Sequence, residues 1–268
     1  MLFPAAPNLA TATLAVAGLS PARATLVAVA GLAAGVVNGV AGGGTMVSFP
    51  SLLALGYPAL TANMTSTVGI WPGYVGGIAG FREEIGDQRR TVVALAPAAV
   101  VGAACGAVLL LTTSQALFAH LAPWLVLGAT VLFAVQPIVS RGLAHVSGHH
   151  PTRRVLMQGG TFVTSVYGGY FGAGMGVLLL AVLGIALPDT LVRSSGLRAA
   201  LSVVVNAVAA LVFIARGTLV WDVVGLLAAG SLVGGWVGST VARRLPAPAL
   251  RAVVVVIGAA TAAKLLAG

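Results

Sequence analysis

Long apolar runs alternate with short charged stretches along the whole chain. Residues 91–112 contain no charged side chain, residues 115–140 contain His120 as their one titratable group, and residues 223–242 are again uncharged. Each run reaches the length of about 20 apolar residues that a helix needs to cross a bilayer. The pattern predicts an all-α polytopic membrane protein.

A further apolar segment, residues 25–57, is interrupted by the stretch VNGVAGGGTMVSFP at residues 37–50. A phosphate-binding loop would need a Lys after its last glycine, but Thr45 and Met46 follow Gly44. The glycine run and Pro50 instead predict a broken membrane helix. Because non-helical backbone cannot face lipid, this break must be buried in protein or line a polar cavity.

The broken segment has a counterpart 130 residues later. At this offset the identical pairs are Gly39 and Gly169, Gly42 and Gly172, Gly44 and Gly174, Leu53 and Leu183, and Pro58 and Pro188. The match predicts two repeats, each a glycine-broken helix followed by three transmembrane helices. The expected divisions are an N-terminal segment (1–22), a first repeat (23–140), a cytoplasmic loop (141–153) and a second repeat (154–268).

The distribution of Arg and Lys bears on how the broken segments run. If both are discontinuous full spans, nine cations lie on one side of the membrane and five on the other. If both are re-entrant hairpins, the division is eleven against three, with Arg23, Arg216 and Lys264 on the poorer side. The positive-inside rule favours the hairpins, which make the second repeat inverted relative to the first.

Composition agrees with a membrane protein and excludes several other classes. The chain is 59% hydrophobic and 7% charged, whereas soluble domains carry about 25% charged residues. Its net charge of +9 comes from cations at the ends of apolar runs, so it indicates topology rather than nucleic-acid binding. Cys105 is the lone cysteine, and His145, His149 and His150 read as a solvated loop rather than a metal site. We therefore expect no metal and no cofactor.

One face of the helix that follows the second break carries candidate ligands for an anion. Ser195, Arg198, Ser202 and Asn206 are spaced by three, four and four residues, which places them along one side of a helix. An Arg inside a membrane is costly in lipid and calls for an anionic partner. The alternative is an Arg198 that extends to the cytoplasmic surface.

The first half offers neutral donors at the corresponding place, although such side chains also bond their own backbone. The helix N-termini after Gly44 and Gly174 would add N–H groups and positive dipole ends. We expect the site near the bilayer midplane, between residues 38–45 and 168–176. The candidate binding residues are Asn38, Gly42, Gly43, Gly44, Thr45, Asn63, Thr65, Ser66, Gly172, Gly174, Ser195, Arg198 and Asn206.

The sequence indicates a transport mechanism that does not use ATP. The sequence contains no nucleotide motif, and Asp189 and Asp222 stand near span starts, so a proton carrier is not obvious. An anion leaving the cell gains about 2.3 kcal/mol per 100 mV of inside-negative potential. An enzyme is not expected, because no His stands beside an intramembrane Ser motif. A passive channel is the alternative, and the oligomeric state stays open, a homo-oligomer included.

The stretch GVVNGVAGGGTMVSFPSLLALGYPALTANMTSTV (35–68) resembles the sulfite exporter TauE/SafE family of bacterial membrane proteins. FGAGMG (171–176) and RSSGLR (193–198) follow the family pattern more loosely. The resemblance implies export of sulfite, sulfoacetate or other sulfonates across the cytoplasmic membrane. Uptake of sulfate-like or other organic anions is the alternative. The implied partners are a small anion and the lipid bilayer, without nucleic acid.

Overall fold

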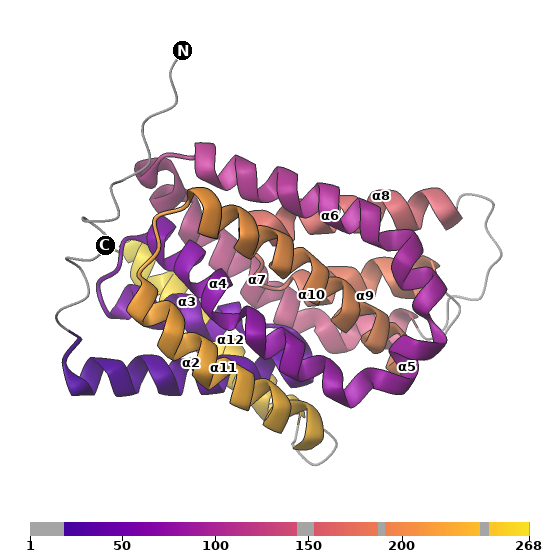
Figure 1. Cartoon of the computed structure of the whole chain (residues 1–268), viewed down its shortest axis with the longest axis horizontal. Coiled ribbons are helices and arrows are strands. Elements are labelled where there is room, and N and C mark those ends of the chain that lie inside the picture. Colours follow the sequence, from indigo (N-terminus) through magenta and orange to yellow (C-terminus); the bar gives the residue numbers. More distant parts are fainter. Residues whose placement is uncertain (1–18, 144–152, 187–190, 242–246, 268) are drawn as a thin grey trace.

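The computed structural model describes residues 19–143, 153–186, 191–241 and 247–267. Within these ranges the chain is helical, without strands (Figure 1). The helices of the first half are α2 (Pro21–Ala41), α3 (Thr45–Ala54), α4 (Ala59–Gly77), η1 (Ile78–Phe81), α5 (Arg82–Asp87), α6 (Arg89–Thr112) and α7 (Gln115–Leu143). Those of the second half are α8 (Arg153–Tyr170), α9 (Met175–Ala186), α10 (Leu191–Arg216), α11 (Trp221–Val241) and α12 (Ala247–Ala267).

Five of the described helices are long and apolar enough to cross a membrane. They cover Pro21–Val40, Arg89–Thr112, Gln115–Ile138, Val192–Arg216 and Trp221–Thr240. Three of them coincide with the uncharged runs found in the sequence. Large apolar side chains on their outer faces are exposed, among them Trp124, Ile138 and Trp236, as expected of surfaces that meet lipid. The prediction of an all-α multi-pass membrane protein is confirmed.

The first broken segment is a hairpin. Gly42 ends α2 with a left-handed φ of 72°, and its N–H donates to the carbonyls of Val37 and Asn38. Helix α3 starts at Thr45 and leads back to the start of α4. Helices α2 and α4 both run parallel to α11, so α3 must return between them. The residues in contact, in order along α11, are Leu227 with Gly31 and Gly69, then Ser231 with Gly35 and Gly73.

The second broken segment turns back in the same way. Gly172 and Gly174 have φ values of 79° and 76°, which only glycine adopts without strain. Helix α9 then runs antiparallel to α8. Its contacts show this direction: Gly168 lies against Met175 and, two turns earlier in α8, Gly160 lies against Val182.

The two hairpins enter from opposite ends of the bundle. Helices α4 and α10 run antiparallel, because Met64 lies beside Gly217 while Trp71 Nε1 donates to the Val203 carbonyl at 3.3 Å. Figure 1 shows α2 with α11 along one edge and α6 with α8 along the other. Both broken segments thus turn back along the bundle. That they are re-entrant in the membrane, and that the halves descend from one duplicated unit, stay predictions.

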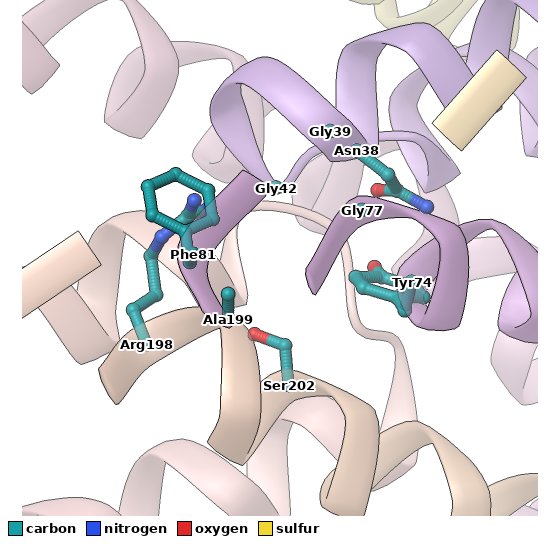
Figure 2. Close-up of a pocket in the computed structure, with 9 residues that line it drawn as sticks. All are labelled: Asn38, Gly39, Gly42, Tyr74, Gly77, Phe81, Arg198, Ala199 and Ser202. Atoms are coloured by element: carbon teal, nitrogen blue, oxygen red, sulfur yellow. The ribbon is translucent and has the colours of Figure 1, made fainter. Parts of the chain in front are cut away.

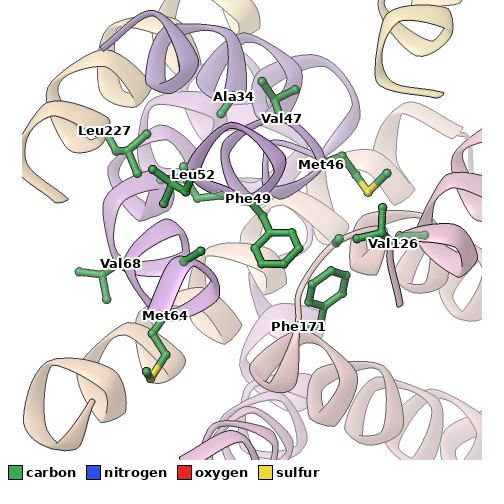
Figure 3. Close-up of a cluster of buried hydrophobic side chains, with 14 of the residues drawn as sticks. Ala34, Met46, Val47, Phe49, Leu52, Met64, Val68, Val126, Phe171 and Leu227 are labelled. Carbon is green, nitrogen blue, oxygen red and sulfur yellow. The ribbon is translucent and has the colours of Figure 1, made fainter. Parts of the chain in front are cut away.

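Close backbone contacts and an aromatic cluster hold the bundle together. Gly230, Gly234 and Gly238 of α11 lie against the backbone of α2, so these glycines let the two helices approach closely. Phe49 of α3 packs edge-on against Phe171, with ring centroids 5.4 Å apart, among the buried apolar side chains of Figure 3. This cluster fills the space between the first hairpin and α7.

Candidate functional site

The two breaks meet inside the protein. A Cβ built on Gly42 would lie 3.7 Å from Gly176 Cα, and one built on Gly172 would lie 3.8 Å from Thr45 Oγ1. Asn63 Nδ2 on α4 also donates to the Tyr170 carbonyl at 3.0 Å, which fixes the second turn to the first half. The structure therefore brings residues 38–45 and 168–176 together as expected. The depth of this junction in a bilayer stays a prediction.

Arg198 of α10 is buried at this junction, with 3% of its surface exposed. Its Nη1 atom occupies the place where a side chain at residue 42 would begin, so the guanidinium lies directly against Gly42. The left-handed turn and the missing side chain at Gly42 thus leave room for the Arg198 guanidinium. An Arg198 that extends to the cytoplasmic surface does not agree with this burial.

A small pocket lies between Arg198 and the first hairpin. Figure 2 shows Arg198 and Ser202 on one side of it and Asn38 and Tyr74 on the other. Within the described ranges no acidic side chain lines it. Its full lining is Asn38, Gly39, Gly42, Tyr74, Gly77, Phe81, Arg198, Ala199 and Ser202.

Each of the four polar residues of this pocket has a buried atom without a hydrogen-bond partner in the described part of the chain. These atoms are Asn38 Nδ2, Tyr74 OH, Arg198 Nε and Ser202 Oγ. All four carry hydrogen and can donate it. A buried donor without an acceptor is unfavourable by about 1–3 kcal/mol, more for a charged group. The pocket is therefore chemically suited to an acceptor-rich, negatively charged ligand.

Helix α4 contributes differently from the prediction. Asn63, Thr65 and Ser66 do not line this pocket. Their hydrogen bonds connect structural elements: Asn63 binds the second turn, Thr65 Oγ1 accepts the N–H of Val220 at 3.3 Å, and Ser66 shares a 2.5 Å hydrogen bond with Ser48. Thr67 donates to its own backbone, at the Asn63 carbonyl.

The glycine turns build the junction more than they line the pocket. Gly44 donates its N–H to Asn38 Oδ1 at 2.6 Å, and Gly43 lies against the Phe133 ring. Gly44, Thr45, Gly172 and Gly174 are not among the lining residues. The pocket lies at the C-terminal end of α2, so the helix N-termini at α3 and α9 do not bound it as expected.

The predicted face of α10 is present in part. Ser202 lines the pocket, and Asn206 donates to the Ser202 carbonyl at 2.9 Å. Ser195, half-buried, stands outside the lining. Arg193 pairs with Asp87 at 3.4 Å on the exposed surface, in agreement with an anchoring role at the membrane boundary.

Tyr74 is the polar lining residue that the sequence analysis missed, and Gly39, Gly77, Phe81 and Ala199 were not among its candidates either. Tyr74 is 5% exposed and lies on α4, seven residues after Thr67 and eleven after Asn63, which places the three on one helix face. Continuing the polar face of α4 by two turns would have found it. An aromatic residue among apolar neighbours gave no reason to do so.

The structure offers no metal centre within the described ranges, where His, Cys, Asp and Glu do not gather in groups of three or more. His145, His149 and His150 lie outside the described residues.

Comparisons with known proteins agree with this architecture. The profile of the family described as Sulfite exporter TauE/SafE matches residues 27–265. A "Probable membrane transporter protein" of Haemophilus influenzae is 23% identical over 243 residues, covering 88% of this chain and 91% of that protein. A "Probable membrane transporter protein ORF9" of Sinorhizobium sp is 26% identical over 242 residues, covering 89% and 90%. No solved structure matches the chain. The chain is a membrane transporter and belongs to the sulfite exporter TauE/SafE family.

Proposed function

We propose that this protein is a secondary transporter that exports small sulfur-containing anions, with Arg198 as the charge that binds them. The observation that carries the proposal is a guanidinium 3% exposed, in a pocket whose lining includes no carboxylate in the described part of the chain. A buried charge without a counter-charge is unfavourable by several kcal/mol. An anion entering the pocket would offset this cost.

The family supports the choice of anion. It is described as a sulfite exporter family, and we extend this to sulfite, sulfoacetate and other sulfonates as substrates. A guanidinium presents N–H groups in a planar fork, which can bind two oxygens of a sulfite or sulfonate group together. Lys would retain the charge without this geometry.

The position of the pocket supports transport rather than storage. Its lining comes from α2 and α4 in the first half and from α10 in the second. A substrate held there would touch both halves, so that movement of one against the other could change which side of the membrane it faces. The membrane potential favours the exit of an anion by about 2.3 kcal/mol per 100 mV and charge, so uniport is sufficient.

Binding to purified protein tests the role of Arg198. The panel is sulfite, sulfoacetate, a second sulfonate and sulfate, with Arg198→Lys and Arg198→Ala compared with the parent. We expect Arg198→Ala to weaken binding by more than about 1.5–3 kcal/mol, the range for a hydrogen bond to a charged group, and Arg198→Lys to weaken it less. The matched control is Arg216→Ala, which removes an exposed Arg from the same helix.

A parent dissociation constant retained by Arg198→Ala would contradict the proposal. Transport in proteoliposomes then distinguishes the alternatives. Single-channel currents far above carrier turnover would favour a passive anion channel, and accumulation of sulfate-like or other organic anions inside right-side-out vesicles would favour an uptake transporter.

A further inference from the structure

We propose that Tyr74, with Asn38 and Ser202, completes a three-helix cage around the anion that selects a trigonal-pyramidal –SO₃ head over a planar carboxylate. The inference rests on the proposed function and assigns residues and a selectivity to the same site. The two groups differ in oxygen number and direction. A carboxylate has two oxygens in one plane, whereas a sulfonate has three that point in three directions.

Arg198 alone cannot distinguish the two groups. Its planar fork can hold two oxygens of either one. Selection for the third oxygen needs donors that approach from outside the plane of the fork. Ser202 stands one helical turn beyond Arg198 on α10, and Asn38 and Tyr74 face both from across the pocket (Figure 2).

Asn38 is held in an orientation that leaves its donor unused. Its Oδ1 atom accepts the N–H of Gly44 at 2.6 Å, so the amide cannot turn over without losing that bond. Its Nδ2 atom is buried without a partner among the described residues. The first glycine turn thereby fixes one donor of the cage.

Tyr74 provides the donor opposite Arg198. Its hydroxyl is buried and has no hydrogen-bond partner among the described residues. On α10, Asn206 Nδ2 already donates to the Ser202 carbonyl at 2.9 Å. The phenolic hydrogen is therefore left for an acceptor that the described protein does not supply.

Such a cage discriminates more strongly against an analogue that lacks one oxygen than against one that differs only in size. Burying donors that the analogue cannot satisfy leaves them unpaired, and sites built to hydrogen-bond a group discriminate strongly against ligands without it. A carboxylate in this pocket would satisfy the Arg198 fork and leave the Tyr74 side unpaired. A sulfonate would reach both.

The test compares sulfoacetate with malonate, which have the same length and charge and differ in one –SO₃ or carboxylate group. Dissociation constants are measured for the parent and for Tyr74→Phe, which keeps the ring and removes the hydroxyl. We expect the parent to bind sulfoacetate more tightly. Tyr74→Phe should lose about tenfold or more for sulfoacetate and less than about twofold for malonate, because only the third oxygen loses its donor.

Tyr170→Phe is the matched control, because its hydroxyl is 3.4 Å from Thr113 Oγ1 and does not line the pocket. It should keep the parent's sulfoacetate-to-malonate ratio. Equal losses for both ligands in Tyr74→Phe would assign Tyr74 a structural role and overturn the cage. A parent that binds malonate as tightly as sulfoacetate would overturn the selection and leave anion transport standing. A parent that binds neither overturns the proposed function, and the cage with it.

Discussion

At the residue scale, Gly42 combines two requirements that are separate elsewhere in the chain. Its φ of 72° is in the left-handed region, and Arg198 occupies the space beside its Cα. Gly56 also has a left-handed φ, 89°, but a Cβ there would meet no atom within 4 Å. Comparing substitutions of Gly42 and Gly56 therefore separates the effect of the left-handed backbone from the effect on Arg198.

We expect Gly42→Ala to abolish anion binding, because the new methyl group displaces the guanidinium from the pocket. Gly56→Ala should leave the dissociation constant unchanged while it lowers stability by about 1–2 kcal/mol, the cost of a left-handed conformation for a residue with a Cβ. Thermal unfolding and ligand titration of both variants in detergent provide the measurements. Full binding by Gly42→Ala would show that Arg198 does not depend on this glycine.

Sequence reasoning picked out a pocket residue whose chemistry is costly in a membrane and passed over one whose chemistry is ordinary there. Arg198 stood out because an intramembrane cation needs a partner. Asn63, Thr65 and Ser66 were predicted to bind an anion. In the structure they bond to other elements outside this pocket, and only tertiary contacts show this. Tyr74 remained unnoticed because a phenol in an apolar helix is common.

At the element scale, α11 depends on glycine where it meets α2. A Cβ on Gly234 would overlap the Leu32 carbonyl oxygen and lie 2.9 Å from the Leu32 carbonyl carbon, closer than real Cβ atoms approach. Gly225, earlier in the same helix, has no neighbour within 4 Å of its Cβ position. The tight contact with backbone of α2 cannot be relieved by turning a side chain.

Gly234→Ala should therefore destabilise the protein by about 1–3 kcal/mol, the usual cost of overpacking, and lower the thermal midpoint. Gly225→Ala makes the same change on the same helix and should not lower the midpoint, since Ala favours helix over Gly. The two are compared by thermal unfolding in one detergent. A Gly225→Ala midpoint that falls as far as that of Gly234→Ala would contradict packing as the cause.

The sequence predicted most elements and left the short ones undetermined. Glycine runs located both breaks, and the charge distribution favoured hairpins, the path that the contacts trace. The charged stretch after α4 contains η1 and α5, which no hydrophobic pattern in the sequence predicts. Gln88 Nε2 joins this stretch to α10 by donating to the Arg193 carbonyl at 2.8 Å. A contact over 105 residues has no local pattern from which to predict it.

At the scale of the whole molecule, the pocket is accessible from one end of the bundle. Of its lining residues, Phe81 and Ala199 are partly exposed, and both lie at the end that carries α5. Toward the other end, the fully buried rings of Phe49, Phe118 and Phe171 pack together. The end of the pocket that reaches partly exposed residues is thus the α5 end.

The positive-inside rule identifies that side as the cytoplasm. Apart from the buried Arg198, eight of the eleven Arg and Lys residues in the described ranges fall at the α5 end. In a Cys105→Ala background, a cysteine replacing Ala199 should therefore react with a membrane-impermeant thiol reagent in inside-out vesicles and be protected in right-side-out vesicles. Sulfoacetate should slow the reaction, because the anion would cover that part of the pocket.

Ser114→Cys is the control for sidedness, because Ser114 is exposed in the connection between α6 and α7, at the opposite end of the bundle. It should react in right-side-out vesicles. If both cysteines react from the same side, the aromatic cluster does not separate the pocket from the outside. If each reacts from the side opposite to the one expected, the bundle has the reverse orientation, and the pocket opens to the outside. An inside-negative potential would then oppose the entry of an anion into the pocket. Export driven by the potential alone would need the pocket to open first at the other end, which the rings of Phe49, Phe118 and Phe171 close.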